Sequence, residues 1–212
     1  MIKTSNMKNI LLLIALSVCV QIMYGQQSWA PIGSEWYYSV PDEGNNPLFD
    51  YLRYESKRDT MVKGKNCRII ESNRSTEIMY EENNKVYYFF NDEFKLIYDF
   101  QAIIDDTVHF EFKSYSPNSQ IIDTTYIVNA VVQKIDTIFI NDTKLKWYST
   151  KLIADQNLNF LVWPNTYDYI ERVGFSFQFM FELSIPTTGE IRNLRCYNDS
   201  EINFLTDWWI DQ

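Results

Sequence analysis

The chain has few of the residues that build metal centres or flexible linkers. Its 212 residues include 3 cysteines, 1 histidine, 6 glycines and 6 prolines. Two of the cysteines, Cys67 and Cys196, lie outside the N-terminal segment, and with the lone His109 they cannot complete a common four-ligand zinc set. No stretch is rich enough in proline or serine to be a linker. We therefore expect neither a metal nor another cofactor.

Catalytic signatures are also missing. Residues 174–178 (GFSFQ) lack the second glycine of a Gly-x-Ser-x-Gly nucleophile motif. Paired acids at 81–82, 92–93 and 105–106 are neighbours in sequence, so in a strand they would point to opposite faces and would not converge as glycosidase carboxylates do. His109 alternates with Val108 and Phe110, which predicts a half-exposed strand histidine and not a general base. We predict no catalytic residue.

Acidic residues outnumber basic residues in this chain. The chain has 19 Lys and Arg against 28 Asp and Glu. Because Lys3 and Lys8 lie in the N-terminal segment, the remainder carries 17 against 28, a net charge of −11. Such a surface repels phosphate backbones and anionic lipid, so a nucleic-acid partner is not expected.

The first 25 residues are typical of an export signal. Lys3 and Lys8 precede an apolar run at 10–20, and Gly25 is a small residue just before the polar start at Gln26. The run is shorter than the roughly 20 residues that span a bilayer. A buried N-terminal helix is the alternative, but the basic flank favours a signal peptide at 1–25. The mature chain, 26–212, is then predicted to be one domain without a membrane span.

Export would place Cys67 and Cys196 in an oxidising compartment as an even pair. We therefore predict a disulfide between them, closing a loop of roughly 130 residues and stabilising the fold by about 4–5 kcal/mol in the chain-entropy description. The alternative is two separately buried thiols.

Aromatic residues make up 17% of the chain, and short runs of β-branched residues recur between Asn, Asp and Gly. This pattern favours strands, and no window keeps a helical apolar stripe. Expected strands cover 36–40, 51–56, 60–62, 66–72, 77–81, 85–90, 95–99, 108–113, 125–133, 137–140, 145–153, 160–163, 169–173, 177–183 and 193–197. The turn signals at 63–65 and 82–84 predict hairpins, and the loop at 114–120 is a candidate boundary between two sheets. The predicted fold is all-β: an antiparallel meander forming a sandwich or an incompletely closed barrel, with few short helices.

A faint repeat relates residues 57–65 to residues 134–142. Each copy has Asp-Thr, an apolar alternation and then a turn residue. The match is short and occurs only twice, so we interpret it as a reused hairpin and not as a solenoid.

Several short segments occur in an order that resembles the N-terminal region of uncharacterised secreted proteins of Bacteroidetes, many of which end in a type IX secretion sorting domain. The segments are 29–38 (WAPIGSEWYY), 59–60 with 64–67, 96–100 with 106–107, 170–174 and 194–199. The resemblance implies an exported β-rich module and no activity. The chain ends soon after Asp199, which leaves no room for a sorting domain, so periplasm, outer surface and extracellular space all stay open as destinations.

Two kinds of residue are candidates for modification or binding. Asp-Thr followed by an apolar residue or threonine occurs at Thr60, Thr107, Thr124 and Thr137, which resembles an O-glycosylation acceptor of exported Bacteroidetes proteins. Ordinary turn-to-strand chemistry explains the same pattern. Exposed aromatics could stack on sugars or fill a partner's pocket, and Trp208 and Trp209 are the candidates nearest the end.

These observations favour an exported, non-catalytic module of the cell envelope or extracellular space that binds a protein or a glycan. Two alternatives remain: a diverged carbohydrate-active or peptidase-like enzyme, and a barrel-type carrier of an apolar ligand. An enzyme would need a concave site with two convergent acids. A carrier would need a large apolar cavity, and a binding module an exposed aromatic patch.

Overall fold

The computed structural model describes residues 29–39, 51–73, 75–115, 121–153, 167–176, 182–183 and 194–206, with side chains omitted at 112–115, 121–126 and 182–183. These residues form strands joined by turns and contain no helix, which confirms the all-β prediction. The strands are β1 (Glu35–Ser39), β2 (Tyr51–Val62), β3 (Lys65–Ser72), β4 (Thr76–Glu82), β5 (Lys85–Phe90), β6 (Glu93–Asp99), β7 (Thr107–Tyr115), β8 (Ile121–Ile140), β9 (Thr143–Ile153), β10 (Tyr169–Ile170), β11 (Gly174–Phe175), β12 (Glu182–Leu183), β13 (Leu194–Asn198) and β14 (Asn203–Leu205).

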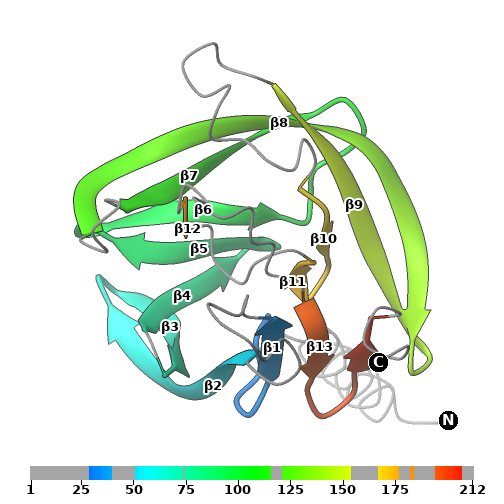
Figure 1. The fold of residues 1–212 in the computed structure, drawn as a ribbon, viewed down its shortest axis with the longest axis horizontal. Coiled ribbons are helices and arrows are strands. Elements are labelled where there is room, and N and C mark those ends of the chain that lie inside the picture. The colour runs from blue at the N-terminus through cyan, green and yellow to red at the C-terminus, as the bar shows by residue number, and fades with distance from the viewer. Residues whose placement is uncertain are drawn as a thin grey trace, which may run out of the picture.

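The strands form two sheets, one of which is curled into a half-barrel. The eight-stranded sheet has the order β14-β13-β1-β2-β3-β4-β5-β6, and the six-stranded sheet has the order β11-β10-β9-β8-β7-β12. All pairs are antiparallel except the short pair of β7 with β12. Figure 1 shows β8 bending in a long arc over the molecule, with β5 and β6 beneath it. The change of sheet therefore falls between β6 and β7, and the prediction that the loop at 114–120 marks it is wrong, because β7 pairs with β8.

Tight turns explain the meander. The turn pairs Lys63-Gly64, Asn83-Asn84, Asn91-Asp92 and Asn141-Asp142 all have positive φ. Two successive left-handed residues match the right-handed twist of the flanking strands, which is why Asn, Asp and Gly stand there. The hairpins predicted at 63–65 and 82–84 are confirmed.

The core between the sheets consists largely of aromatic rings. Tyr148 and Tyr169 stack with centroids 4.7 Å apart. Their hydroxyls donate to the carbonyls of Phe100 (2.6 Å) and Asp99 (3.0 Å) at the end of β6. On the other side, the indole N–H of Trp36 in β1 donates to the Val173 carbonyl at 2.7 Å. Buried Tyr and Trp groups that find partners in this way join the two sheets as well as filling the space.

The sheets also meet along the chain's last strands. The Leu194 amide at the start of β13 donates to the Ser176 carbonyl beside β11 at 2.9 Å. At the start of β14, the Asn203 amide donates to Oδ1 of Asn141 at the tip of the β8–β9 hairpin at 2.7 Å. In Figure 1 these contacts bring β13 and β11 together near the centre and β14 to the lower right.

Candidate binding groove

A bulge in β2 determines which side chains face the inside of the eight-stranded sheet. The register shifts between Ser56 and Arg58, so Ser56 pairs with Ile70 whereas Asp59 pairs with Arg68. Arg68 in turn pairs with Met79, a fully buried core residue. Strict alternation from Ser56 would have turned Asp59 outward. The extra residue, Lys57, instead turns Asp59 to the inner face beside Arg68, as bulges near functional sites do.

A groove lies over this part of β2, β3 and β4. Its volume is about 470 Å³, within the range of small-molecule sites. Asp59, Arg68 and Glu81 supply charges, and Trp29 supplies an aromatic wall. The full lining is Trp29, Asp59, Asn66, Cys67, Arg68, Met79, Tyr80 and Glu81. We call this the β2–β4 groove.

The polar side chains of the β2–β4 groove have unused hydrogen-bonding capacity. Nε of Arg68 lies 3.0 Å from Oδ1 of Asp59, and Oε2 of Glu81 accepts the Trp29 amide at 2.7 Å. Within the described part of the chain, the Nη groups of Arg68, the Asn66 amide and the second carboxylate oxygens of Asp59 and Glu81 have no hydrogen-bond partner. The groove therefore offers donors and acceptors side by side, held on rigid strands.

Glu81 is a partly buried carboxylate in the groove. Burial raises the pKa of its carboxyl, the Trp29 amide opposes that rise, and the negative charge of Glu171 adds to it. A partly desolvated carboxylate of this kind gains from any ligand group that donates a hydrogen bond or carries a positive charge.

Comparison with other proteins does not assign this site. No family model matches the chain, and neither a curated protein nor a solved structure is significantly similar to it. Function must therefore be inferred from the chemistry of the described residues.

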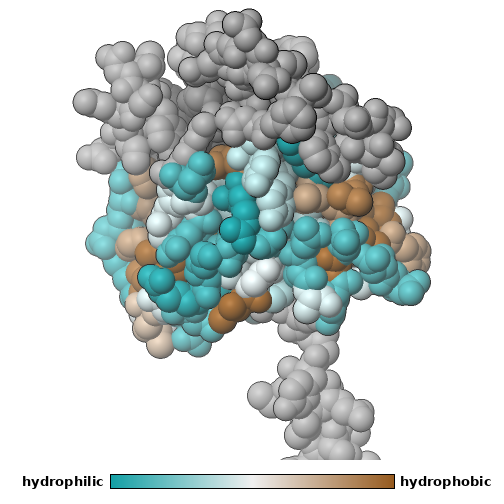
Figure 2. Space-filling model, turned by 60° about the horizontal axis from the view of Figure 1, so that its bottom comes forward, coloured by the Kyte–Doolittle hydropathy of each residue, from teal (hydrophilic) through white to brown (hydrophobic). Residues whose placement is uncertain are grey.

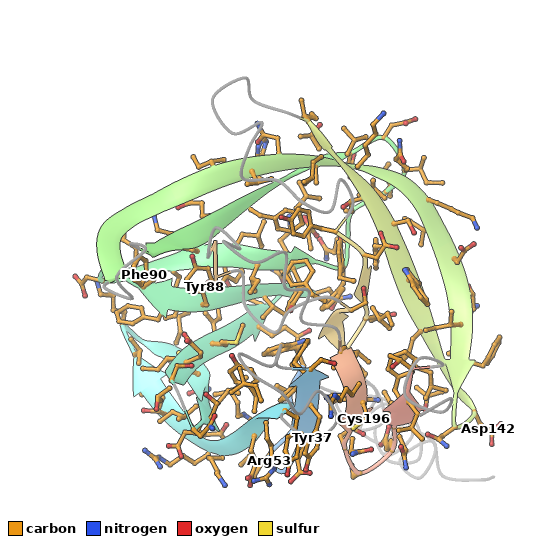
Figure 3. The ribbon with its side chains drawn as sticks, in the orientation of Figure 1. Tyr37, Arg53, Tyr88, Phe90, Asp142 and Cys196 are labelled. Carbon is orange, nitrogen blue, oxygen red and sulfur yellow. The ribbon has the colours of Figure 1, made fainter. Side chains whose placement is uncertain are left out.

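A second groove, of about 530 Å³, lies on the outer face of β2 and β3 and differs from the first in its electrostatics. Arg53 is paired with Glu35 and, at 2.6 Å, with Glu55, and Lys57 lies 2.5 Å from Glu55. Figure 3 shows Arg53 beside Tyr37, at the bottom of the view. Because its charges are already paired with one another, this groove has fewer free groups for a ligand. The surrounding face, turned forward in Figure 2, is mostly hydrophilic with hydrophobic residues in separate groups.

Aromatic rings also gather on the outer face of β4, β5 and β6. Tyr80 and Tyr87 stack with centroids 4.9 Å apart, and Phe94 meets Tyr80 edge-on at 4.5 Å. Adjacent aromatics divide between the two faces of β5: Tyr88 and Phe90 are buried, whereas Tyr87 is half-buried on the outer side. Tyr80 itself is only 9% exposed, so this cluster is largely packed against itself.

The predicted disulfide is absent. Cys67 and Cys196 are free thiols, buried and half-buried respectively. Cys67 lies in β3 and Cys196 in β13, with β1 and β2 between them. Three inter-strand steps separate the Cα atoms by about 14 Å across the sheet, twice the reach of a disulfide. The even number of cysteines and the expected oxidising compartment predicted a disulfide, but the strand order keeps the two cysteines too far apart. The alternative of two separate thiols describes this fold.

We expect a thiol count to confirm this. If residues 1–25 are removed on export, the protein denatured without reductant should react with about two equivalents of a thiol reagent, because the strand order keeps the two sulfurs apart. Burial raises the pKa of both thiols, so in the native protein they should react slowly. A count near zero in denaturant would show a bridge and contradict the strand order.

The remaining predicted residues are distributed over the surface or lie outside the described part. Thr107 and Thr137 are exposed and Thr60 is half-buried, while the side chain of Thr124 is not among those described. Glycosylation at these positions stays a prediction. Trp208 and Trp209 and the segment 1–25 lie outside the described residues. His109 is exposed, with Val108 and Phe110 buried, as predicted, and its Nδ1 lies 2.5 Å from Oδ1 of Asn129.

Sequence reasoning missed the groove. The sequence patterns assign Asp59 only to a glycosylation motif, and Glu81 only to the end of an expected strand and to a pair of neighbouring acids. Two signals of the groove are nevertheless present: the alternation breaks between the expected strands 51–56 and 60–62, and Arg68 interrupts an apolar strand. The break is the bulge, and the interrupting charge is the partner of Asp59.

Proposed function

We propose that the chain is an exported, non-catalytic β-module of the cell envelope or extracellular space that binds a glycan in the β2–β4 groove. The observation that carries this proposal is the set of unpaired donors and acceptors on Arg68, Asn66, Asp59 and Glu81. Export is supported by the signal-like residues 1–25.

A glycan suits this set because each sugar hydroxyl both donates and accepts. Arg68 presents N–H groups to hydroxyl oxygens, and Asp59 and Glu81 accept hydroxyl protons. Trp29 and Met79 also line the groove, but both are buried, so the polar side chains would make the main contacts with a sugar. A protein partner would be expected to use a broad apolar patch, and the outer aromatic cluster is already largely packed.

Hydrolysis of a glycan is the second candidate, because Asp59 and Glu81 are two acids lining one groove and the pKa of Glu81 is raised by burial. Binding is favoured over catalysis because one carboxylate oxygen of Asp59 is already engaged by Arg68 at 3.0 Å. The carrier alternative is not supported by the described residues, whose interior is occupied by closely packed rings. Among these residues no helix is long and apolar enough to cross a membrane.

The test is a screen of oligosaccharides followed by titration calorimetry on two arginine variants. Arg68→Ala should weaken binding of any ligand found by about 10- to 100-fold, because it removes charged hydrogen bonds in a partly desolvated site. Arg58→Ala is the matched control, since Arg58 lies on the same hairpin but its side chain is 65% exposed and faces out toward Glu71.

Equal affinities of the two variants, or no bound sugar in the screen, would contradict the proposal. If the protein releases reducing ends from a bound oligosaccharide, and Glu81→Gln abolishes that release, hydrolysis replaces binding as the proposed function.

A further inference from the structure

We infer that the β2–β4 groove prefers a sugar bearing a free amino group, and that Glu81 is the residue that selects it. This inference rests on the proposed function and names the ligand class for the same site. It depends on the charges of the groove and on which of them are already neutralised.

Arg68 and Asp59 neutralise each other. Their side chains face each other across β2 and β3 with a 3.0 Å ion pair, so together they contribute no net charge. Arg68 still has N–H groups for hydroxyl oxygens, but its positive charge is balanced. An anionic sugar therefore finds no uncompensated cation here, and the protein's acidic surface adds repulsion.

Glu81, in contrast, carries a charge that is not balanced within the groove. Met79 pairs with Arg68, and Glu81 lies two positions further along β4 on the same inner face. Its one described hydrogen bond, from the Trp29 amide, engages only Oε2. The charge that contributes to its raised pKa is that of another carboxylate, Glu171. Among the described residues, Oε1 is therefore a half-buried acceptor in a negative potential without a cation of its own.

An amino sugar would supply the missing cation. An ammonium placed against Oε1 would make a charge-assisted hydrogen bond and relieve the repulsion from Glu171. The hydroxyls of the same sugar would meet Asn66, Asp59 and Arg68. A neutral sugar would make the hydroxyl contacts but not the contact with Glu81.

Three tetrasaccharides with the same β-1,4 backbone isolate this contact. Cellotetraose carries a 2-hydroxyl, chitotetraose a 2-acetamido group, and fully deacetylated chitotetraose a 2-ammonium. Affinities are measured by calorimetry at about pH 6, where free amines are protonated and ordinary carboxylates are ionised. The deacetylated ligand should bind at least about 10-fold more tightly than cellotetraose.

Variants separate this contact from general attraction to an acidic protein. Glu81→Gln should remove the preference and bring the deacetylated ligand to the affinity of cellotetraose. Glu82→Gln changes the net charge equally but alters an exposed residue whose carboxylate pairs with Lys65 at 2.7 Å, and it should keep the preference.

The outcomes separate the amine preference from the proposed function. If cellotetraose binds as tightly as the deacetylated ligand and Arg68→Ala weakens both, the amine preference is wrong and the proposed function stands. If Glu81→Gln and Glu82→Gln behave alike, the attraction is not local and the inference fails. If none of the three ligands binds, the amino-sugar inference is overturned, while the oligosaccharide screen with Arg68→Ala decides the proposed function separately.

Discussion

Replacing Arg172 by alanine is expected to lower the free energy of unfolding by about 3–5 kcal/mol, because it leaves a buried carboxylate without its cation. Arg172 is 8% exposed in the turn between β10 and β11. Its guanidinium pairs with Asp199 at 2.7 Å and with Glu201 at 3.1 Å, next to β14. The side chain of Asp199 is 1% exposed. Urea unfolding of a protein comprising residues 26–212 at neutral pH measures the change in the free energy of unfolding.

Arg58→Ala is the control for Arg172→Ala, since the Arg58–Glu71 pair at 3.5 Å is exposed and should contribute at most about 1 kcal/mol. The ion pairs of Arg172 with Asp199 and Glu201 join the β10–β11 turn to the β13–β14 turn. If both variants lose the same stability, these ion pairs are not a major contributor to the stability of the fold.

The ion pair of Arg172 with Asp199 also predicts that the stability of the fold depends on pH. Burial tends to raise the pKa of Asp199, but hydrogen bonds from Tyr197 and from the amides of Glu201 and Ile202, together with the charge of Arg172, lower it below its usual value. A group whose pKa is lowered on folding stabilises the fold above the unfolded pKa, about 3.9 for Asp. This stability is lost as pH falls through the lower folded pKa. Asp199→Asn should reduce that acid-dependent loss in urea unfolding measured across this pH range.

Gly174→Ala is the second substitution with a large expected effect, about 2–6 kcal/mol. The φ of Gly174 is +91°, and a Cβ there would lie 2.6 Å from the hydroxyl oxygen of Tyr98. That hydroxyl is fixed because it accepts the Phe175 amide at 3.2 Å in the core. Backbone strain of about 1–3 kcal/mol and overpacking of about 1–3 kcal/mol therefore combine.

Gly33→Ala separates these two contributions. Gly33 has nearly the same φ, +88°, but no described atom lies within 4 Å of the Cβ that alanine would add. It should show the strain alone, about 1–3 kcal/mol. Thermal and urea unfolding of the two variants in parallel give the difference in stability. Equal losses of stability would mean that Tyr98 moves aside for the added methyl group at no measurable cost.

Local patterns in the sequence predicted much of the strand content. Lys85–Phe90 alternates in burial, as a strand at the predicted position 85–90 should, and the left-handed turns stand at Lys63-Gly64 and Asn83-Asn84 as their residue types require. These features depend on residues that are close together in the sequence, so the sequence alone is enough to predict them.

Features that depend on distant pairing could not be predicted. Whether Cys67 can reach Cys196 depends on β1 and β2 lying between their strands. The inward turn of Asp59 depends on the register of β2 against β3, and the expected strands 51–56 and 60–62 divide β2 into two. Both follow from strand order and register, which no local periodicity encodes.

The claim that the β2–β4 groove is the glycan site is tested most directly by amide chemical shifts. A protein comprising residues 26–212, labelled with ¹⁵N, is titrated with the tightest-binding oligosaccharide. We expect the largest shifts at Asp59, Asn66, Arg68 and Glu81 and at the Trp29 indole. Largest shifts at Arg53 and Lys57 in the outer groove, or shifts spread evenly over both sheets, would contradict the claim.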